Sequence, residues 1–174
     1  VARNEWTIEG WVNLTNALHL TNNVTLGGPI LVRQRPATPI AGSLVNYGLG
    51  VSPQGVELWF NDPKVAGNPD SDDPAFELIR SYQPLSPAVF HHVAGSFRQV
   101  SSNRVELKLY VDGVLTRQAA LPGILTNTLD LAQPENLVLS LGTNTVGYPS
   151  LGGLRGFNGV IDDLSFYRRA LSDE

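Results

Sequence analysis

An acidic segment between residues 61 and 74 carries side chains suited to holding a cation. Asp70, Asp72 and Asp73 lie close together there, and Asn68 precedes them. Carboxylate, amide and backbone carbonyl oxygens are the hard ligands that Ca²⁺ prefers. The segment lacks the glycine and the trailing glutamate of an EF-hand loop, so its likeness to a calcium site is one of composition. We expect either a Ca²⁺ site at these aspartates or an ordinary solvated loop.

Acidic residues spaced for bond cleavage are the second chemistry to consider. Hydrolysis of a glycosidic bond uses two carboxyl groups about 5 to 9.5 Å apart. Glu57 is followed at alternate positions by Trp59 and Asn61, so its strand offers no second acid on the same face. Asp162 and Asp163 are adjacent, and a regular strand would send them to opposite sides of its sheet. The sequence therefore predicts no catalytic residues and a protein that is not an enzyme, with a divergent glycoside hydrolase as the less favoured alternative.

Aromatic and amide side chains point to a third chemistry, the binding of sugars. A sugar presents apolar C–H patches ringed by hydroxyl groups, so aromatic faces beside amides and carboxylates suit it. The candidate ligand-binding residues lie in predicted loops or on one strand: Trp59, Asn61, Tyr82, Asn144 and Tyr148. Core packing is the competing explanation for each aromatic residue among them.

Several polar residues have structural interpretations instead. His91 and His92 are strand neighbours that face opposite ways, so we expect a histidine hydrogen-bonded in or near the core rather than a metal pair. Glu9 shares a strand face with Trp11, and Asp162 shares one with Phe166. We expect both aromatic residues in the core. Both acids would then face inward and need hydrogen-bond donors or a metal, and hydrogen bonds are the commoner solution.

These side chains must be positioned by strands, because strand signals dominate the chain. Residues 103–111 alternate apolar and polar types, and Asp112-Gly113 then favours a tight hairpin turn into residues 114–120. Other short strands are bounded by Gly, Pro, Asn or Asp, and a helix start is predicted only at Ser172. The remaining predicted strands span residues 5–13, 28–34, 44–51, 55–61, 75–81, 89–98, 136–142 and 158–168. The pattern predicts an all-β fold of two packed antiparallel sheets.

Four segments give this pattern a family resemblance. They are WTIEGWV at residues 6–12, FHHVAGSF at 90–97, LKLYVDGVL at 107–115 and the closing stretch from residue 154 onward. In this order they resemble the laminin-G-like jelly-roll domain of the concanavalin A-like lectin and glucanase superfamily. The resemblance implies a single sandwich domain over residues 1–174. It also implies a carbohydrate-binding or adhesion module in which calcium is common, and acids at positions 9 and 162 that link the first and last strands.

The composition of the chain limits the classes of partner that we expect it to bind. The net charge is −4 with 16% charged residues, and Lys and Arg are not gathered in a basic stripe, which argues against nucleic acid as a partner. No apolar run reaches the roughly 18 residues of a membrane-spanning helix, so membrane insertion is not expected. We expect a domain cut from a larger protein that is secreted or on the cell surface, with a carbohydrate or an extracellular protein as its partner. The alternative is a structural or protein-interaction scaffold without a small ligand.

Overall fold

The computed structural model describes residues 5–15, 20–21, 24–25, 28–35, 44–61, 76–122, 138–141 and 157–170. These residues form strands, turns and short connections, and no helix occurs among them. Their strands are β1 (Glu5–Leu14), β2 (Leu20–Thr21), β3 (Val24–Thr25), β4 (Gly28–Arg35), β5 (Leu44–Ser52), β6 (Gly55–Asn61), β7 (Phe76–Arg80), β8 (Phe90–Ser101), β9 (Arg104–Val111), β10 (Val114–Pro122), β11 (Val138–Leu141) and β12 (Gly159–Tyr167).

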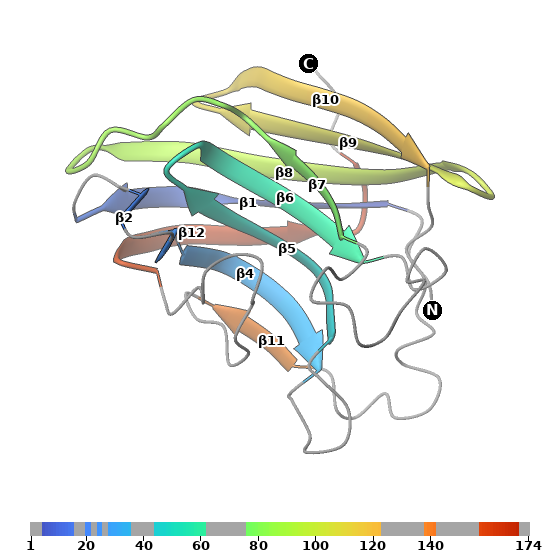
Figure 1. The fold of residues 1–174 in the computed structure, drawn as a ribbon, viewed down its shortest axis with the longest axis horizontal. Helices are drawn as coiled ribbons and strands as arrows, with labels where there is room; N and C mark the ends of the chain where they lie inside the picture. Colours follow the sequence, from blue (N-terminus) through green and yellow to red (C-terminus); the bar gives the residue numbers. More distant parts are fainter. Residues whose placement is uncertain are drawn as a thin grey trace.

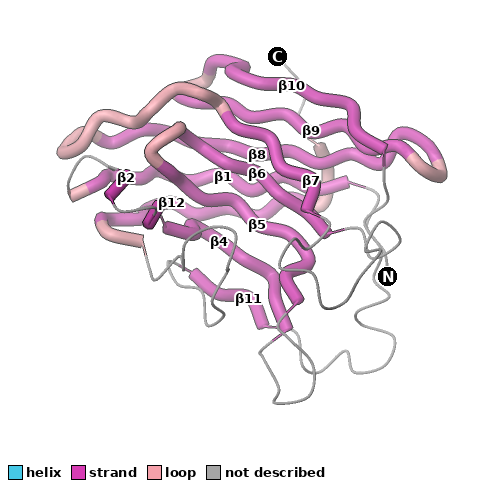
Figure 2. The backbone as a smooth tube through the Cα atoms, in the orientation of Figure 1, coloured by secondary structure: helices cyan, strands magenta, loops and turns pink. Residues whose placement is uncertain are grey.

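The strands assemble into two five-stranded antiparallel sheets that face each other (Figures 1 and 2). The first sheet has the order β10-β9-β8-β1-β12, and the second has the order β11-β4-β5-β6-β7. β2 and β3 form a separate two-stranded ribbon that the sequence analysis did not predict. The predicted all-β sandwich of two antiparallel sheets is confirmed, as are the ten predicted strands to within a few residues at each end.

The β9–β10 hairpin shows how local sequence builds the first sheet. Val105 and Leu107 are buried in β9 and alternate with more exposed polar residues, as the period of two predicts. Asp112 and Gly113 then adopt φ angles of 52° and 77°. Two successive positive φ angles define the tight turn that matches the twist of paired strands, and an Asp-Gly pair tolerates them. β10 accordingly folds back onto β9 with Val114 opposite Val111.

The core lies between the sheets, and strands of both sheets supply it with buried side chains such as Ile8 of β1, Leu49 of β5 and Leu107 of β9. Trp6 on β1 stacks on Phe97 of β8 with ring centroids 5.3 Å apart, and on Tyr47 of β5 at 4.6 Å. Phe166 of β12 lies beside both Trp6 and Tyr47, so the predicted core position of Phe166 is correct. Rings from both sheets therefore pack together, and their burial is the main force that holds the layers face to face.

β1 occupies an interior position of the first sheet, between β8 and β12. Its residues pair with β8 from Glu5 opposite Arg98 to Asn13 opposite Phe90, and with β12 on the other side. The first and last described strands are thus hydrogen-bonded neighbours. Over the part of the chain that the structure describes, no helix is long and apolar enough to cross a membrane. The helix start predicted at Ser172 lies outside the described residues.

Candidate functional site

The outer face of the first sheet carries an exposed tryptophan. On β1 the side chains of Ile8, Val12 and Leu14 are buried toward the second sheet. Because strand residues alternate between faces, Trp11 must point the other way. Its side chain is 41% exposed. The expectation that Trp11 belongs to the core is therefore wrong.

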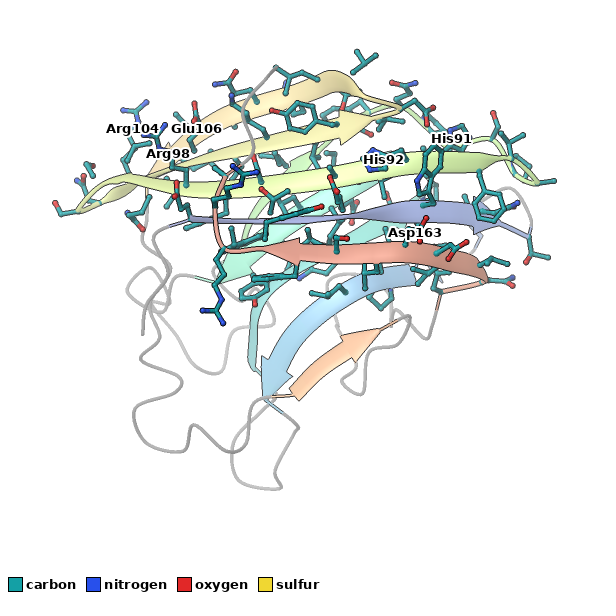
Figure 3. The ribbon with its side chains drawn as sticks, turned by 180° about the vertical axis from the view of Figure 1, so that it is seen from behind. His91, His92, Arg98, Arg104, Glu106 and Asp163 are labelled. Carbon is teal, nitrogen blue, oxygen red and sulfur yellow. The ribbon has the colours of Figure 1, made fainter. Side chains whose placement is uncertain are left out.

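Two residues on neighbouring strands flank Trp11 directly. His92 of β8 is its partner on one side, and Asp162 of β12 is its partner on the other. The His92 ring meets the indole edge-on, with centroids 5.3 Å apart and an angle of 63° between the planes. In Figure 3, which views this sheet from its outer side, His92 lies on β8 and Asp163 on β12 toward the same end of the sheet, with β1 between the two strands. Trp11 thus stands in a row of polar residues across three strands.

Apolar side chains extend the exposed apolar surface from Trp11 toward one end of the sheet. Asn13, two residues after Trp11 on the same face, pairs with Phe90 of β8 and with Val160 of β12. Phe90 and Val160 are both exposed. An indole, a phenyl ring and an isopropyl group therefore surround one amide on the solvent side of the sheet.

Glu9 borders the tryptophan on the opposite side. Its Oε1 accepts a hydrogen bond of 2.8 Å from the hydroxyl group of Tyr167, and its Oε2 lies 3.8 Å from His92 Nε2. Glu9 therefore faces outward, and the expectation of an inward-facing acid is wrong, because the apolar side of β1 is formed by its even-numbered residues. The bond to Tyr167 nevertheless joins β1 to β12, the strands that the family resemblance linked through this acid.

A β-bulge in β12 sets the position of the second acid. Glu9 is opposite Ser165 but Trp11 is opposite Asp162, so β12 holds one more residue than β1 between these pairs. Asp163 takes a φ of 47° there, and Asp162 Oδ1 accepts the Asp163 backbone N–H at 2.9 Å. Both aspartates are exposed. Asp162 faces outward with Trp11, so its predicted inward orientation is wrong as well. The bulge also replaces the regular alternation that would have placed the two aspartates on opposite faces.

The β9–β10 turn clamps the end of β8 beside this surface. Asp112 Oδ2 lies 2.8 Å from His91 Nδ1, and Asp112 Oδ1 accepts the backbone N–H of His92 at 2.9 Å. Partial burial alone would raise the pKa of Asp112, but these hydrogen bonds and the nearby histidines outweigh it and hold that pKa below its ordinary value. His91 is thus mostly buried and bonded to a carboxylate, in line with the structural role expected for one histidine of the pair.

We define the Trp11 surface as the outward-facing residues around this indole: Glu9, Trp11, Asn13, Phe90, His92, Val160 and Asp162. Its chemistry combines an aromatic face with hydrogen-bonding groups at its border. A pyranose ring stacks its C–H patch on such a face while its hydroxyl groups reach amides and carboxylates. The arrangement is suited to binding a sugar.

Trp59, a predicted ligand-binding residue, lies on the other sheet and is buried. Its indole covers Gly48 of the neighbouring strand so closely that a Cβ at Gly48 would come within 2.6 Å of the ring. Trp59 is only 2% exposed. Its face is occupied by backbone, so packing accounts for it.

Glu57 shares the outer face of β6 with Trp59 and is also buried. Arg80 on β7 pairs with it across the strands, with Arg80 Nε 2.6 Å from Glu57 Oε1. Glu57 is 3% exposed. A carboxylate removed from water needs such a partner, and Arg80 supplies both a hydrogen bond and a countercharge.

Tyr82 belongs neither to the Trp11 surface nor to the Glu57–Arg80 pair. It follows β7, is 65% exposed, and has the guanidinium carbon of Arg117 on β10 at 5.8 Å from its ring centroid. Asn61 ends β6, and only its backbone belongs to the described structure. The structure thus does not bring Trp59 and Tyr82 together into one site.

The remaining predicted site residues lie outside the described residues. These are the loop residues proposed for sugar contact or calcium: Asn144, Tyr148, Asp70, Asp72 and Asp73. Within the described ranges, no group of three or more His, Cys, Asp or Glu side chains is placed to hold a metal ion.

Sequence reasoning missed Trp11, although a signal for it was present. Trp6, Ile8, Val12 and Leu14 share one parity on β1, and the opposite parity holds the polar residues and Trp11. Counting the whole strand, rather than trusting residue type, would have placed this indole outside.

Two facing antiparallel sheets with adjacent first and last strands define a jelly-roll sandwich of the concanavalin A-like class. The chain belongs to this class by sequence as well: the laminin G-type family model described as "Concanavalin A-like lectin/glucanases superfamily" matches residues 1–174. No curated protein matches the sequence.

Solved structures share the fold at low sequence identity. A heptameric SAP-like pentraxin from Limulus polyphemus is 15% identical with a TM-score of 0.52, over 99% of this chain and 67% of that one. An endo-β-1,4-glucuronan lyase from the fungus Trichoderma reesei is 10% identical with a TM-score of 0.54, over 96% and 70% of the two chains. Alginate lyase vAL-1 from a Chlorella virus is 12% identical with a TM-score of 0.53, over 96% and 72%. These similarities show the fold, which lectins and polysaccharide-cleaving enzymes share.

Proposed function

We propose that this domain is a non-catalytic carbohydrate-binding module whose binding site is the Trp11 surface. The observation that carries the proposal is the exposed indole on an open sheet face, with an amide and two carboxylates at its border. A tryptophan side chain exposed to water forgoes the favourable free energy of burial, and a stacked sugar ring recovers part of it. The superfamily supports a carbohydrate ligand, since lectins are among its members.

The contacts of two described acids, Glu57 and Glu9, favour binding over catalysis. Glu57 is neutralised by Arg80, and Glu9 is held by the Tyr167 hydroxyl group. Glu57 and Glu9 therefore already have structural partners. A catalytic acid or base instead needs access to the bond that it cleaves. The related folds of two polysaccharide lyases make an enzymatic role the second candidate, and an assay of polysaccharide cleavage tests it.

A glycan array with a matched pair of variants tests the main proposal. Trp11→Ala removes the stacking face, and we expect affinity for any bound glycan to fall about tenfold or more. Tyr82→Ala removes an exposed aromatic residue outside the Trp11 surface and should leave affinity unchanged. The proposal fails if the wild-type domain binds no glycan with or without Ca²⁺, or if Tyr82→Ala is the variant that loses binding. Capture of a protein partner that Trp11→Ala abolishes would instead indicate an adhesion surface.

Three expectations remain proposals that accompany this function: secretion or cell-surface location, a place within a larger protein, and a calcium ion at the acidic segment of residues 61–74. Thermal unfolding with EDTA or with millimolar Ca²⁺ tests the last of them. A cation bound only by the native state raises the unfolding midpoint as its concentration rises. An unchanged midpoint would leave Asp70, Asp72 and Asp73 as ordinary surface residues.

A further inference from the structure

We propose that the Trp11 surface selects its glycan by charge. It binds chains whose sugars are uncharged or carry a protonated amino group, and it excludes polyuronates. This inference rests on the proposed carbohydrate-binding function and specifies its ligand class. The indole provides the site, and the acids at its border provide the selection.

The carboxylates of Glu9 and Asp162 belong to the residues nearest to Trp11 on the same face of the sheet, one along its strand and one across to β12. Glu9 is two residues from Trp11 along β1, and Asp162 is its cross-strand partner on β12. Side chains in these relations have Cβ atoms about 5 to 7 Å apart. Asp163 follows at the bulge and is exposed. A sugar stacked on Trp11 therefore meets negative charge on two sides.

The two histidines at this end of the sheet do not cancel the negative charge around the indole. His91 is opposite the inward-facing Val12 and lies 2.8 Å from Asp112, and His92 Nε2 lies 3.8 Å from Glu9 Oε2. Each imidazole is thus matched to a carboxylate even when it is protonated. Asp162 makes no ion pair with any other described residue, so its charge stays uncompensated at the border of the site.

Two arginines of this sheet, Arg98 and Arg104, lie at its other end. Figure 3 shows Arg98 and Arg104 with Glu106 near one end, and His91, His92 and Asp163 near the other. His92 and Arg98 are six residues apart on β8, which is about 20 Å along an extended strand. Salt screens charges beyond about 8 Å at physiological ionic strength. Arg98 and Arg104 therefore do not offset the acids around Trp11.

Three oligosaccharides that share one backbone isolate the effect of charge. Hexamers of β-1,4-linked glucose, glucosamine and glucuronic acid present the same pyranose shape and differ in an amino group or a carboxylate. We would measure their affinities by calorimetry in a mildly acidic buffer of low ionic strength. We expect the glucosamine chain to bind most tightly and the glucuronic acid chain least, with steps of about fivefold that shrink at high salt.

One variant and a matched control assign the selection to this surface. Asp162→Asn keeps the shape of the side chain and removes its charge, so we expect the difference between the three chains to shrink by about fivefold. Glu106→Gln makes the same change in charge at the far end of the sheet. It should leave unchanged both the order of the three affinities and the ratios between them.

The outcomes separate this inference from the proposed function. Preference for the glucuronic acid chain, with all binding lost in Trp11→Ala, would overturn the charge selection and leave the carbohydrate site standing. Equal selectivity in Asp162→Asn and the wild-type domain would overturn it too. Failure of all three chains to bind would also overturn this inference, and the glycan array alone would then decide the proposed function.

Discussion

The hydroxyl group of Tyr167 donates a hydrogen bond of 2.8 Å to Glu9 Oε1 across 158 positions of sequence. The bond lies on the outer face of the first sheet, where β12 runs beside β1. A second link nearby joins Thr7 Oγ1 to the backbone oxygen of Arg169 at 2.9 Å. Together they fasten the last described strand to the first through side chains as well as through the backbone ladder.

We expect Tyr167→Phe to lower the free energy of unfolding by about 1 to 2 kcal/mol. The substitution removes the donor and leaves a carboxylate oxygen that is largely shielded from water without its partner, and bonds to charged groups contribute more than neutral ones. Urea unfolding followed by tryptophan fluorescence measures the change. Glu9→Gln is the comparison, since its amide oxygen still accepts the bond and the loss should be smaller. Equal losses in the two variants would contradict the assigned role of the hydroxyl group.

Phe97→Ala should destabilise the domain by about 3 to 5 kcal/mol. Its ring is fully buried and stacks on Trp6 at the centre of the sandwich, so truncation leaves a cavity between two sheets that cannot collapse freely. Phe97→Leu fills most of that space and should cost less than the alanine variant. Denaturant unfolding checks both. A loss below about 1 kcal/mol for Phe97→Ala would mean that this ring is not central to the core.

The lowered pKa of Asp112 predicts that this residue makes a small contribution to the acid sensitivity of the folded domain. Its pKa is lower in the folded protein than in the unfolded chain, so its contribution to stability is fully present above the unfolded value of about 3.9 and is lost as the pH falls through the folded value. The side chain is 48% exposed, and solvent screening therefore limits the effect to below about 1 kcal/mol.

The variant Asp112→Asn tests this component, because asparagine suits the positive φ of the turn and cannot titrate. We expect it to be less stable than the wild-type domain near neutral pH, with the difference shrinking as the pH falls through the lowered pKa of Asp112. Unfolding curves recorded from neutral pH downward give this comparison. A difference that stays constant with pH would show that the charge of Asp112 has no part in it.

Gly48→Ala should destabilise the second sheet by about 1 to 3 kcal/mol. The added methyl group would lie 2.6 Å from the indole of Trp59, so the ring must move or tilt. Replacing Trp59 by leucine in the same chain relieves that clash. Thermal unfolding of Gly48→Ala, Trp59→Leu and the double variant measures the coupling. Additive losses would contradict the close approach.

The strands and their pairing were predictable from the sequence because local patterns specify them. The alternation of β9 and the Asp112-Gly113 turn fix a hairpin through neighbouring residues alone. The outward orientation of Trp11 is also contained in the sequence, in the parity of β1, whereas tryptophan as a residue type favours the core.

The site depends on features that a single sequence does not specify. The bulge that turns Asp162 outward with Trp11 arises from a one-residue mismatch between β12 and β1, which lie far apart in the chain. The Glu9–Tyr167 bond has the same origin. Burial of Trp59 depends on the glycines of the adjacent strand, so its residue type alone suggested a ligand contact.

The place of β1 between β8 and β12 has a consequence for how the chain reaches its native state. β1 can pair with β8 once the first hundred or so residues are available, but its other edge finds its partner only when β12 has been synthesised. Until then that edge presents unsatisfied amide and carbonyl groups, a template for pairing with a second nascent chain. Contacts between residues so distant along the polypeptide also slow folding, because a large loop must close before they form. We therefore expect the domain to fold on the timescale of milliseconds to seconds.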